Sequence, residues 1–124
     1  MAAPAYDSNN IFARILRGEI PCKKLHETEH SLAFHDIAPQ APVHVLVIPK
    51  GAYRDMSDFC ARAGAEEMQD YLRAIGEVAA MTGLSEGGYR AISNCGRDSG
   101  QEVPHLHVHL VGGGKLGPLL SARP

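Results

Sequence analysis

The 124-residue sequence has no tryptophan and only three cysteines, which stand far apart and form no C-x-x-C pair. Cys22, Cys60 and Cys95 therefore predict no disulfide framework and favour a reducing compartment. No apolar run approaches the length of a membrane span, and the N-terminus has neither the basic nor the apolar region of a signal peptide. We expect a cytoplasmic protein with no membrane partner.

The sequence also lacks a surplus of either charge. Twelve Lys and Arg residues against fourteen Asp and Glu residues give a formal net charge of −2. Dedicated nucleic-acid-binding proteins usually carry a basic excess, so we expect no nucleic-acid partner, whereas a single nucleotide stays open as a ligand. With 44% hydrophobic residues and no fixed-period repeat, the chain predicts one domain over 1–124, with an N-terminal arm (1–9) and a C-terminal tail (112–124).

The first half of the chain predicts one short helix and three strands, at residues 11–17, 22–27, 31–37 and 43–48. Asn10 can cap the helix, and Gly18 provides its C-terminal stop. The third strand, Val43–Ile48, is β-branched and almost wholly apolar, which predicts a central strand buried on both faces.

The second half predicts one long helix and two further strands. Apolar residues recur at steps of three and four between Ser57 and Gly83, as in an amphipathic helix; they are Met68, Leu72, Ile75 and Ala79. The strands are expected at Gly88–Asn94 and His105–Val111. Because the strands cluster instead of alternating with helices, the pattern predicts an α+β fold with a mainly antiparallel sheet of about five strands.

Three of the seven histidines lie within five residues, at positions 105, 107 and 109, and alternate with apolar residues. On a strand, alternate side chains share a face, so the three imidazoles project from one side at roughly 7 Å spacing. A single histidine of this kind is most simply explained as a solvent-facing residue without a function, but that explanation is much weaker for three histidines in strict alternation. Imidazoles can bind a metal or act as nucleophiles and acid–base groups, and the residues alone leave both open.

Seven segments of the sequence match one known family pattern in order. His105–Val111 has the form His-φ-His-φ-His-φ-φ, with φ apolar, and the other six segments are residues 10–15, 18–21, 33–37, 39–44, 47–50 and 100–103. From Asn10 to Gly113 the sequence thus resembles the histidine-triad (HIT) family, in its nucleotide-binding Hint branch. The resemblance implies the HIT-type α+β fold, with a sheet that continues across a two-fold homodimer.

The resemblance further implies an enzyme that cleaves purine nucleoside phosphoramidates, such as adenylylated amines. It would bind the AMP or GMP unit and release the nucleoside monophosphate and an amine. His107 is then the nucleophile on the α-phosphorus, and water hydrolyses the covalent nucleotidyl-histidine. A neutral imidazole attacks without prior deprotonation, and neighbouring donors can stabilise the developing charge, so we expect no metal and no cofactor.

Other residues take their roles from the same resemblance. The backbone carbonyl of His105 accepts the Nδ1–H of His107, His109 contacts the phosphate, His44 completes a proton network and Asp36 binds the ribose hydroxyls. The implied base and ribose pocket is Ile11, Phe12, Ile15, Phe34, Ile37 and Leu46, and the implied phosphate loop is Asn94, Gly100, Gln101, Glu102 and Val103. Taken singly, His44 and each of the apolar residues are more typical of a core than of a binding site, and Asp36 is as typical of a turn.

Three features depart from the family pattern and bear on leaving-group selectivity. Glu102 stands where animal members carry a serine that assists the departing amine, and Pro104 stands where an aromatic residue is common. No tryptophan occurs in the tail, where some relatives have one. Because proline cannot donate a ladder hydrogen bond, we expect the strand to begin at His105.

Alternative functions are a dinucleoside polyphosphate hydrolase, a nucleotide-binding adaptor protein and, more distantly, a metal-dependent hydrolase. An adaptor has no need of three aligned imidazoles, and the segments 39–42 and 100–102 look more like the phosphoramidase branch. The apolar helix face of Met68, Leu72, Ile75 and Ala79 is a candidate dimer interface, and packing of that face on its own sheet is the alternative.

Overall fold

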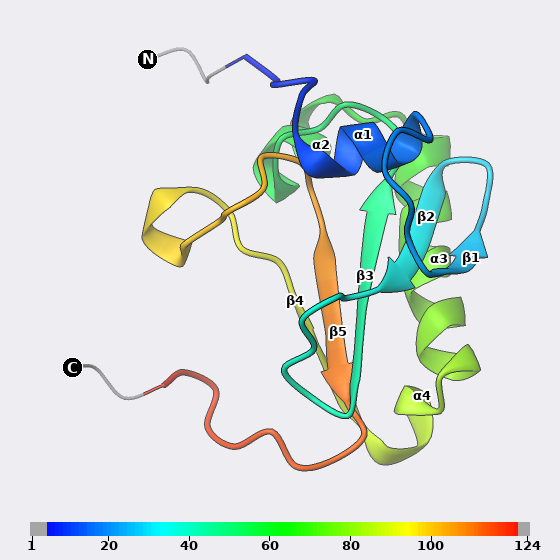
Figure 1. The fold of residues 1–124 in the computed structure, drawn as a ribbon, viewed down its shortest axis with the longest axis vertical. Helices are drawn as coiled ribbons and strands as arrows, with labels where there is room; N and C mark the ends of the chain where they lie inside the picture. The colour runs from blue at the N-terminus through cyan, green and yellow to red at the C-terminus, as the bar shows by residue number, and fades with distance from the viewer. Residues whose placement is uncertain (1–4, 122–124) are drawn as a thin grey trace.

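Five antiparallel strands form one sheet, in the order β1-β2-β3-β5-β4, in the computed structural model, which describes residues 5–121 (Figure 1). The strands are β1 (Lys24–Glu27), β2 (Ser31–His35), β3 (Val43–Pro49), β4 (Tyr89–Ile92) and β5 (Val108–Gly112). The helices are α1 (Ile11–Leu16), α2 (Met56–Arg62), α3 (Ala65–Met81) and α4 (Leu84–Gly87), with a 3₁₀ turn, η1 (Arg97–Ser99). The predicted α+β class is confirmed; residues 1–4 of the arm and 122–124 of the tail lie outside the described residues.

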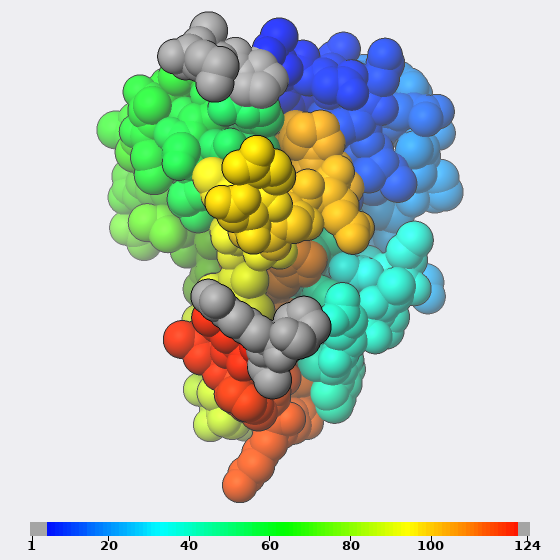
Figure 2. Space-filling model, turned by 90° about the vertical axis from the view of Figure 1, so that its left-hand side faces the viewer, coloured from blue at the N-terminus to red at the C-terminus, as the bar shows by residue number. Residues whose placement is uncertain are grey.

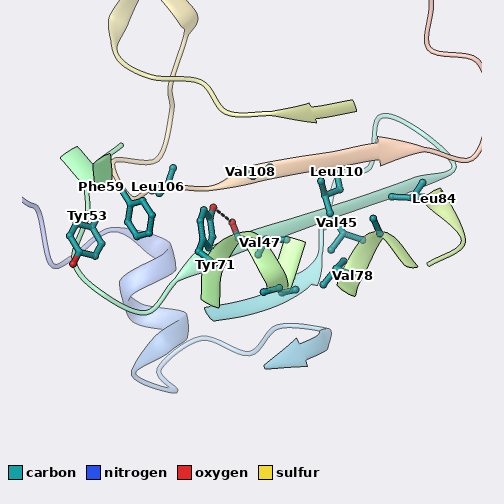
Figure 3. Packing of buried hydrophobic residues seen from close by; sticks show 13 residues of the cluster. Val45, Val47, Tyr53, Phe59, Tyr71, Val78, Leu84, Leu106, Val108 and Leu110 are labelled. Atoms are coloured by element: carbon teal, nitrogen blue, oxygen red, sulfur yellow. Dashed lines mark hydrogen bonds between the residues drawn. The ribbon is translucent and has the colours of Figure 1, made fainter. Parts of the chain in front are cut away.

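The larger core lies between one face of the sheet and α3 (Figure 3). Val45 and Val47 from β3 and Leu110 from β5 are fully buried there against Val78 of α3. The hydroxyl of Tyr71 donates to the carbonyl oxygen of Val47 at 2.7 Å, so this polar atom is satisfied inside the core. The contacts of this face thus fix α3 against the sheet.

The smaller core lies on the opposite face and covers only part of it. Phe12 of α1 packs on Phe34 of β2 at a ring-centroid distance of 5.7 Å, together with Leu32, Leu46 and Ile48. Asn10 caps α1, since its side chain accepts the N–H of Ala13 at 2.9 Å. Pairing of Leu46 with His109 and of His44 with Val111 places both histidines on the same face, beyond the end of this cluster.

The long helix predicted between Ser57 and Gly83 is two helices, α2 and α3, and the short helix α4 follows Gly83. Residues 63 and 64 are extended, and the Gly64 N–H donates to the Glu67 carboxylate at 3.1 Å, which begins α3. The core-facing residues of α3 are Tyr71, Ala74, Val78 and Ala79. Leu72, which we assigned to the apolar face, is 69% exposed, because residues 71, 74 and 78 already occupy the side turned to the sheet. Ala79 is fully buried, and Met68 and Ile75 also pack on this core, so only Leu72 of the proposed interface is left uncovered.

The strand expected at His105–Val111 begins its ladder at Val108. Before that point the His105 N–H bonds to the Val103 carbonyl and the Leu106 N–H to the Tyr53 carbonyl, at 2.9 and 2.8 Å, in place of ladder partners. The alternation of side chains survives this change, since Leu106 is buried in the larger core. Among residues 5–121, no helix is long and apolar enough to cross a membrane.

Candidate active site

His107 has one ring nitrogen bonded and the other unbonded. Its Nδ1–H donates to the carbonyl oxygen of His105 at 2.7 Å, the bond that the resemblance implies. Nε2 then carries the lone pair and has no hydrogen-bond partner in the part of the chain that the structure describes. Phe12 stands edge-on to the ring at a centroid distance of 5.0 Å. Burial lowers the pKa of His107, which favours the neutral, nucleophilic imidazole.

His105 lies beneath the site and is completely buried. Its Nε2–H donates to the carbonyl oxygen of Pro49 at 2.8 Å, so its Nδ1 accepts the hydroxyl of Tyr6 at 2.6 Å. Burial lowers the pKa of His105 to about 4. This imidazole is thus a fixed, neutral support for the backbone carbonyl that orients His107.

His44 and His109 form a chain of hydrogen bonds with a defined direction. The backbone N–H of Gln40 donates to Nδ1 of His44 at 3.0 Å, so the proton of His44 is on Nε2. That Nε2–H donates to Nδ1 of His109 at 2.9 Å, which leaves His109 with an Nε2–H. Burial lowers the pKa of His109 to about 4, so it is a neutral hydrogen-bond donor at physiological pH.

Asp36 stands beside this chain at the end of β2. Its Oδ2 lies 3.4 Å from Nε2 of His44, and its Oδ1 accepts the N–H of Ala38 at 2.7 Å. The Asp36 N–H in turn bonds to the carbonyl of His44, which ties the turn after β2 to the start of β3. One oxygen of the carboxylate is therefore committed to the turn, while Asp36 also borders the cavity beside His107.

A cavity of about 210 Å³, which we call the triad cavity, brings these side chains together; it is lined by Phe12, Asp36, Gln40, Leu46, Asn94, Gly100, Glu102, Val103, His107 and His109. Figure 2 shows the corresponding hollow between the yellow and orange loop of residues 95–104 and the cyan segment 36–42. All of these residues except Gln40 belong to the set that the sequence places at the site. Their contact with a nucleotide remains a prediction.

Other predicted site residues lie off the wall of this cavity. Phe34 is buried behind Phe12, and Ile15 packs at the margin of the same cluster. Ile11 is 41% and Ile37 is 91% exposed, because each side chain points away from the smaller core. The side-chain amide of Gln101 donates to the carbonyls of Arg54 and Val103, at 2.8 and 3.0 Å, so it holds the loop in place from behind.

Two contributors were missed by the sequence analysis, Tyr6 and Gln40. Tyr6 is 99 residues from its partner His105, and no local pattern links the two. Gln40 acts through its backbone N–H, a group that every residue except proline has, so its side-chain type carries no signal of this role. Its position between two prolines, at 39 and 42, is the only sequence feature that marks the turn.

The side chains of Asp36, His44 and His109 also have ligand atoms within 4.8 Å of one another, as a metal site would require. A metal-bound histidine normally donates its other ring N–H to an acceptor. Here the other ring nitrogen of His44 faces a donor, the Gln40 N–H. A metal on Nε2 of His44 would break that bond, so the donor set fits a hydrogen-bond relay and does not fit a metal.

Three alternating, tautomer-fixed histidines, two just before β5 and one within it, lie at one face of an antiparallel sheet, and this arrangement beside a cavity defines a histidine-triad domain. Comparison with known proteins agrees, since the HIT domain family matches residues 17–116. The chain belongs to the HIT family.

Individual relatives cover nearly the whole chain. A 13.2 kDa HIT-like protein of Azospirillum brasilense is 65% identical over 119 residues, 96% of this chain and 98% of its own. The purine nucleoside phosphoramidase of Escherichia coli K12 is 40% identical over 111 residues, 90% of this chain and 92% of its own. A solved HIT family hydrolase from Clostridium thermocellum superposes with a TM-score of 0.83 at 42% identity, covering 90% of this chain and 97% of that one.

The neutral histidines predict a pH-dependent stability. The folded-state pKa of His105 and of His109 lies near 4, below the ordinary value of 6.5, so the unfolded chain binds more protons between these limits. The free energy of unfolding should therefore rise with pH through this window and be lower at pH 5 than at pH 7.5 by roughly 1–3 kcal/mol. Urea unfolding followed by circular dichroism measures the difference.

Ion pairs lower the pKa of the Glu27 and Asp58 carboxylates to about 2. These groups titrate mainly below pH 5, so they contribute little to the difference in stability between pH 5 and pH 7.5. His105→Asn should reduce the dependence on pH, and His35→Asn, which removes an exposed imidazole from β2, serves as the control. Equal stability of the parent at pH 5 and 7.5 would contradict the prediction.

Proposed function

We propose that this chain is a hydrolase that cleaves purine nucleoside phosphoramidates to a nucleoside monophosphate and an amine. The observation that carries the proposal is the pair of opposite hydrogen-bonding states on one cavity wall, a free Nε2 lone pair on His107 and an Nε2–H donor on His109. A nucleophile beside a neutral donor suits attack on an anionic phosphorus centre. The activity named for the E. coli relative supports the same substrate class.

In the proposed reaction, Nε2 of His107 forms a bond to the α-phosphorus while the P–N bond to the amine breaks. The amine nitrogen takes up a proton from solvent and leaves, and His107 becomes a cationic nucleotidyl-imidazolium; the later hydrolytic step returns a proton to solvent. Its Nδ1–H bond to the His105 carbonyl, at 2.7 Å, stabilises that positive charge. Water then attacks phosphorus and restores the imidazole, so that one water supplies the hydroxyl of the phosphate and the hydrogen of the amine.

The remaining residues of the triad cavity would bind the nucleotide. Phe12, Leu46 and Val103 give an apolar wall for the nucleoside, and the Asp36 carboxylate can accept from ribose hydroxyls. His109, through Nε2–H, would donate to a non-bridging phosphate oxygen on which charge develops, and it keeps its proton throughout. Asn94 and the backbone of Gly100 offer further donors on the same wall.

A substrate panel tests the proposal directly. We expect the adenosine and guanosine phosphoramidates to turn over faster than a diadenosine polyphosphate, and a chelator to leave the rates unchanged, because the relay at His44 does not fit a metal. Product release is followed by chromatography. Faster turnover of the polyphosphate would move the chain to the dinucleoside polyphosphate hydrolases, loss of activity with chelator would favour a metal-dependent hydrolase, and nucleotide binding without turnover would favour an adaptor.

Substitution of His107 separates chemistry from binding. His107→Asn should lower turnover by several orders of magnitude, since it removes the covalent nucleophile, while binding of AMP measured by calorimetry is largely kept. His109→Asn, which removes one donor, should cost less, roughly 10²–10³-fold. Near-normal turnover of His107→Asn, with loss in His109→Asn, would show that the nucleophile is assigned to the wrong histidine.

We also propose a homodimer that joins through β4. This strand forms one edge of the sheet, and Tyr89 and Ile92 are 38% and 39% exposed on it, as expected of an edge that pairs with a second copy. Light scattering at micromolar concentration should give about twice the chain mass of 13.3 kDa. A mass near that of one chain would contradict the dimer.

A further inference from the structure

A second cavity, of about 250 Å³, adjoins the triad cavity; it is lined by Gln40, Ala41, His44, Arg90, Ile92, Asn94, His109, Val111 and Leu116. We call it the Arg90 cavity. Both cavities have Gln40, Asn94 and His109 in their walls, whereas His107 borders only the first and Arg90 only the second. A phosphate held between His107 and His109 would therefore stand at their junction, with the Arg90 cavity on the side away from the nucleophile.

The register of the sheet places Arg90 in this position. Arg90 pairs with Val111 and Ile92 pairs with His109, so these four side chains share the face that carries the active site. In β4, Tyr89 and Ala91 alternate with them and face the other way. Arg90 is consequently a neighbour of the catalytic histidines in space, although it precedes them by 15 or more residues.

The charge on Arg90 has no counter-ion among residues 5–121. Its guanidinium donates to the backbone carbonyls of Pro118, at 3.0 Å, and of Gly117, which hold the head group in place without neutralising it. These bonds use two of the five N–H groups of an arginine and leave donors for a ligand. Nearby, Ile92, Val111 and Leu116 form an apolar part of the wall, and Gln40, His44, Asn94 and His109 form its polar part.

A fixed, unneutralised guanidinium beside the apolar side chains of Ile92, Val111 and Leu116 suits a small ligand that combines a carboxylate with an aliphatic group. The cavity of about 250 Å³ offers one guanidinium for a carboxylate and a short apolar surface for a side chain, which matches a single amino-acid residue. Because the Arg90 cavity lies beyond the expected position of the phosphate, it can bind the amine that leaves phosphorus.

We propose that the Arg90 cavity binds the departing amine and selects amines that carry a carboxylate, so that the preferred substrates are purine nucleoside phosphoramidates of amino acids linked through the α-nitrogen. The inference rests on the proposed phosphoramidase function. The bonds made and broken are those given above; Arg90 pairs with the carboxylate and exchanges no proton.

A matched pair of substrates isolates this contact. One is adenosine 5′-phosphoramidate N-linked to leucine, with its free carboxylate, and the other is the same compound with leucinamide. Because the two amines differ in intrinsic leaving ability, the measured quantity is the ratio of their kcat/KM values in each variant. Arg90→Gln should lower the leucine-to-leucinamide ratio about 10- to 100-fold, the range expected for loss of a hydrogen bond to a charged group.

Two further variants separate charge from structure. Arg90→Lys keeps the positive charge but changes the support of residues 117 and 118, and it should retain most of the ratio. Arg97→Gln removes an exposed arginine of η1 that borders neither cavity, and it should leave the ratio unchanged. An equal loss for both substrates in Arg90→Gln and Arg90→Lys would show that Arg90 only anchors the tail, and would overturn the proposal.

An unchanged ratio in Arg90→Gln would overturn it as well. If the parent protein cleaves neither these two compounds nor the phosphoramidates of the substrate panel, the proposed function fails, and calorimetric binding of the two uncleaved compounds then tests the inference alone. In that case tighter binding of the leucine compound that is lost in Arg90→Gln supports carboxylate recognition, and equal binding in the parent contradicts it. Cleavage of the panel phosphoramidates without cleavage of the leucine compound would overturn the inference and leave the proposed function standing.

Discussion

The bond from the Nδ1–H of His107 to the carbonyl oxygen of His105 determines much of the architecture around the site. The carbonyl of His105 accepts its hydrogen bond from the side chain of His107, two residues later, whereas a carbonyl in a regular strand ladder accepts from the backbone of the neighbouring strand. The segment accordingly leaves the sheet: the His105 and Leu106 N–H groups bond to Val103 and Tyr53, and β5 begins only at Val108. The irregular backbone just before β5 is thus part of the arrangement that leaves Nε2 of His107 free.

The same logic extends to the other imidazoles, each of which has its tautomer fixed by a partner outside the triad. Tyr6 and Pro49 fix His105, and the N–H of Gln40 fixes His44 and through it His109. The rings of His105 and His109 are neutral, because burial lowers the pKa of each to about 4. Protonation of either ring would break one of these bonds, so we expect the same arrangement to make the fold sensitive to acid.

The sequence could predict the parts of this design that repeat locally. The apolar run Val43–Ile48, the cap at Asn10 and the alternation of residues 105–110 each have a periodicity or a residue type that indicates the local structure, and β3, α1 and the two-faced segment agree with them. The resemblance to the HIT family added the hydrogen bond between His105 and His107, which no spacing rule provides. The periodicity wrongly placed Leu72 on the buried side of α3. Steps of three and four residues are compatible with two neighbouring lines of side chains along the helix, and only the packing against the sheet decides which line is buried.

What the sequence could not predict depends on contacts between distant segments or on backbone groups. Tyr6 lies far from His105 along the chain, Gln40 acts through its N–H, and Arg90 reaches the site through its pairing opposite Val111.

These contacts show why one sheet face can hold two adjoining cavities with different chemistry. His109 lines both cavities, and its hydrogen bond with His44 determines which of its ring nitrogens carries the proton. His107 lines only the triad cavity, and Arg90 lines only the Arg90 cavity. In the reaction that we propose, phosphorus at this junction would be attacked by His107 on one side, and its amine substituent would leave toward Arg90 on the other. The registers of β3 with β5 and of β5 with β4 would then position that reaction as directly as the three histidines do.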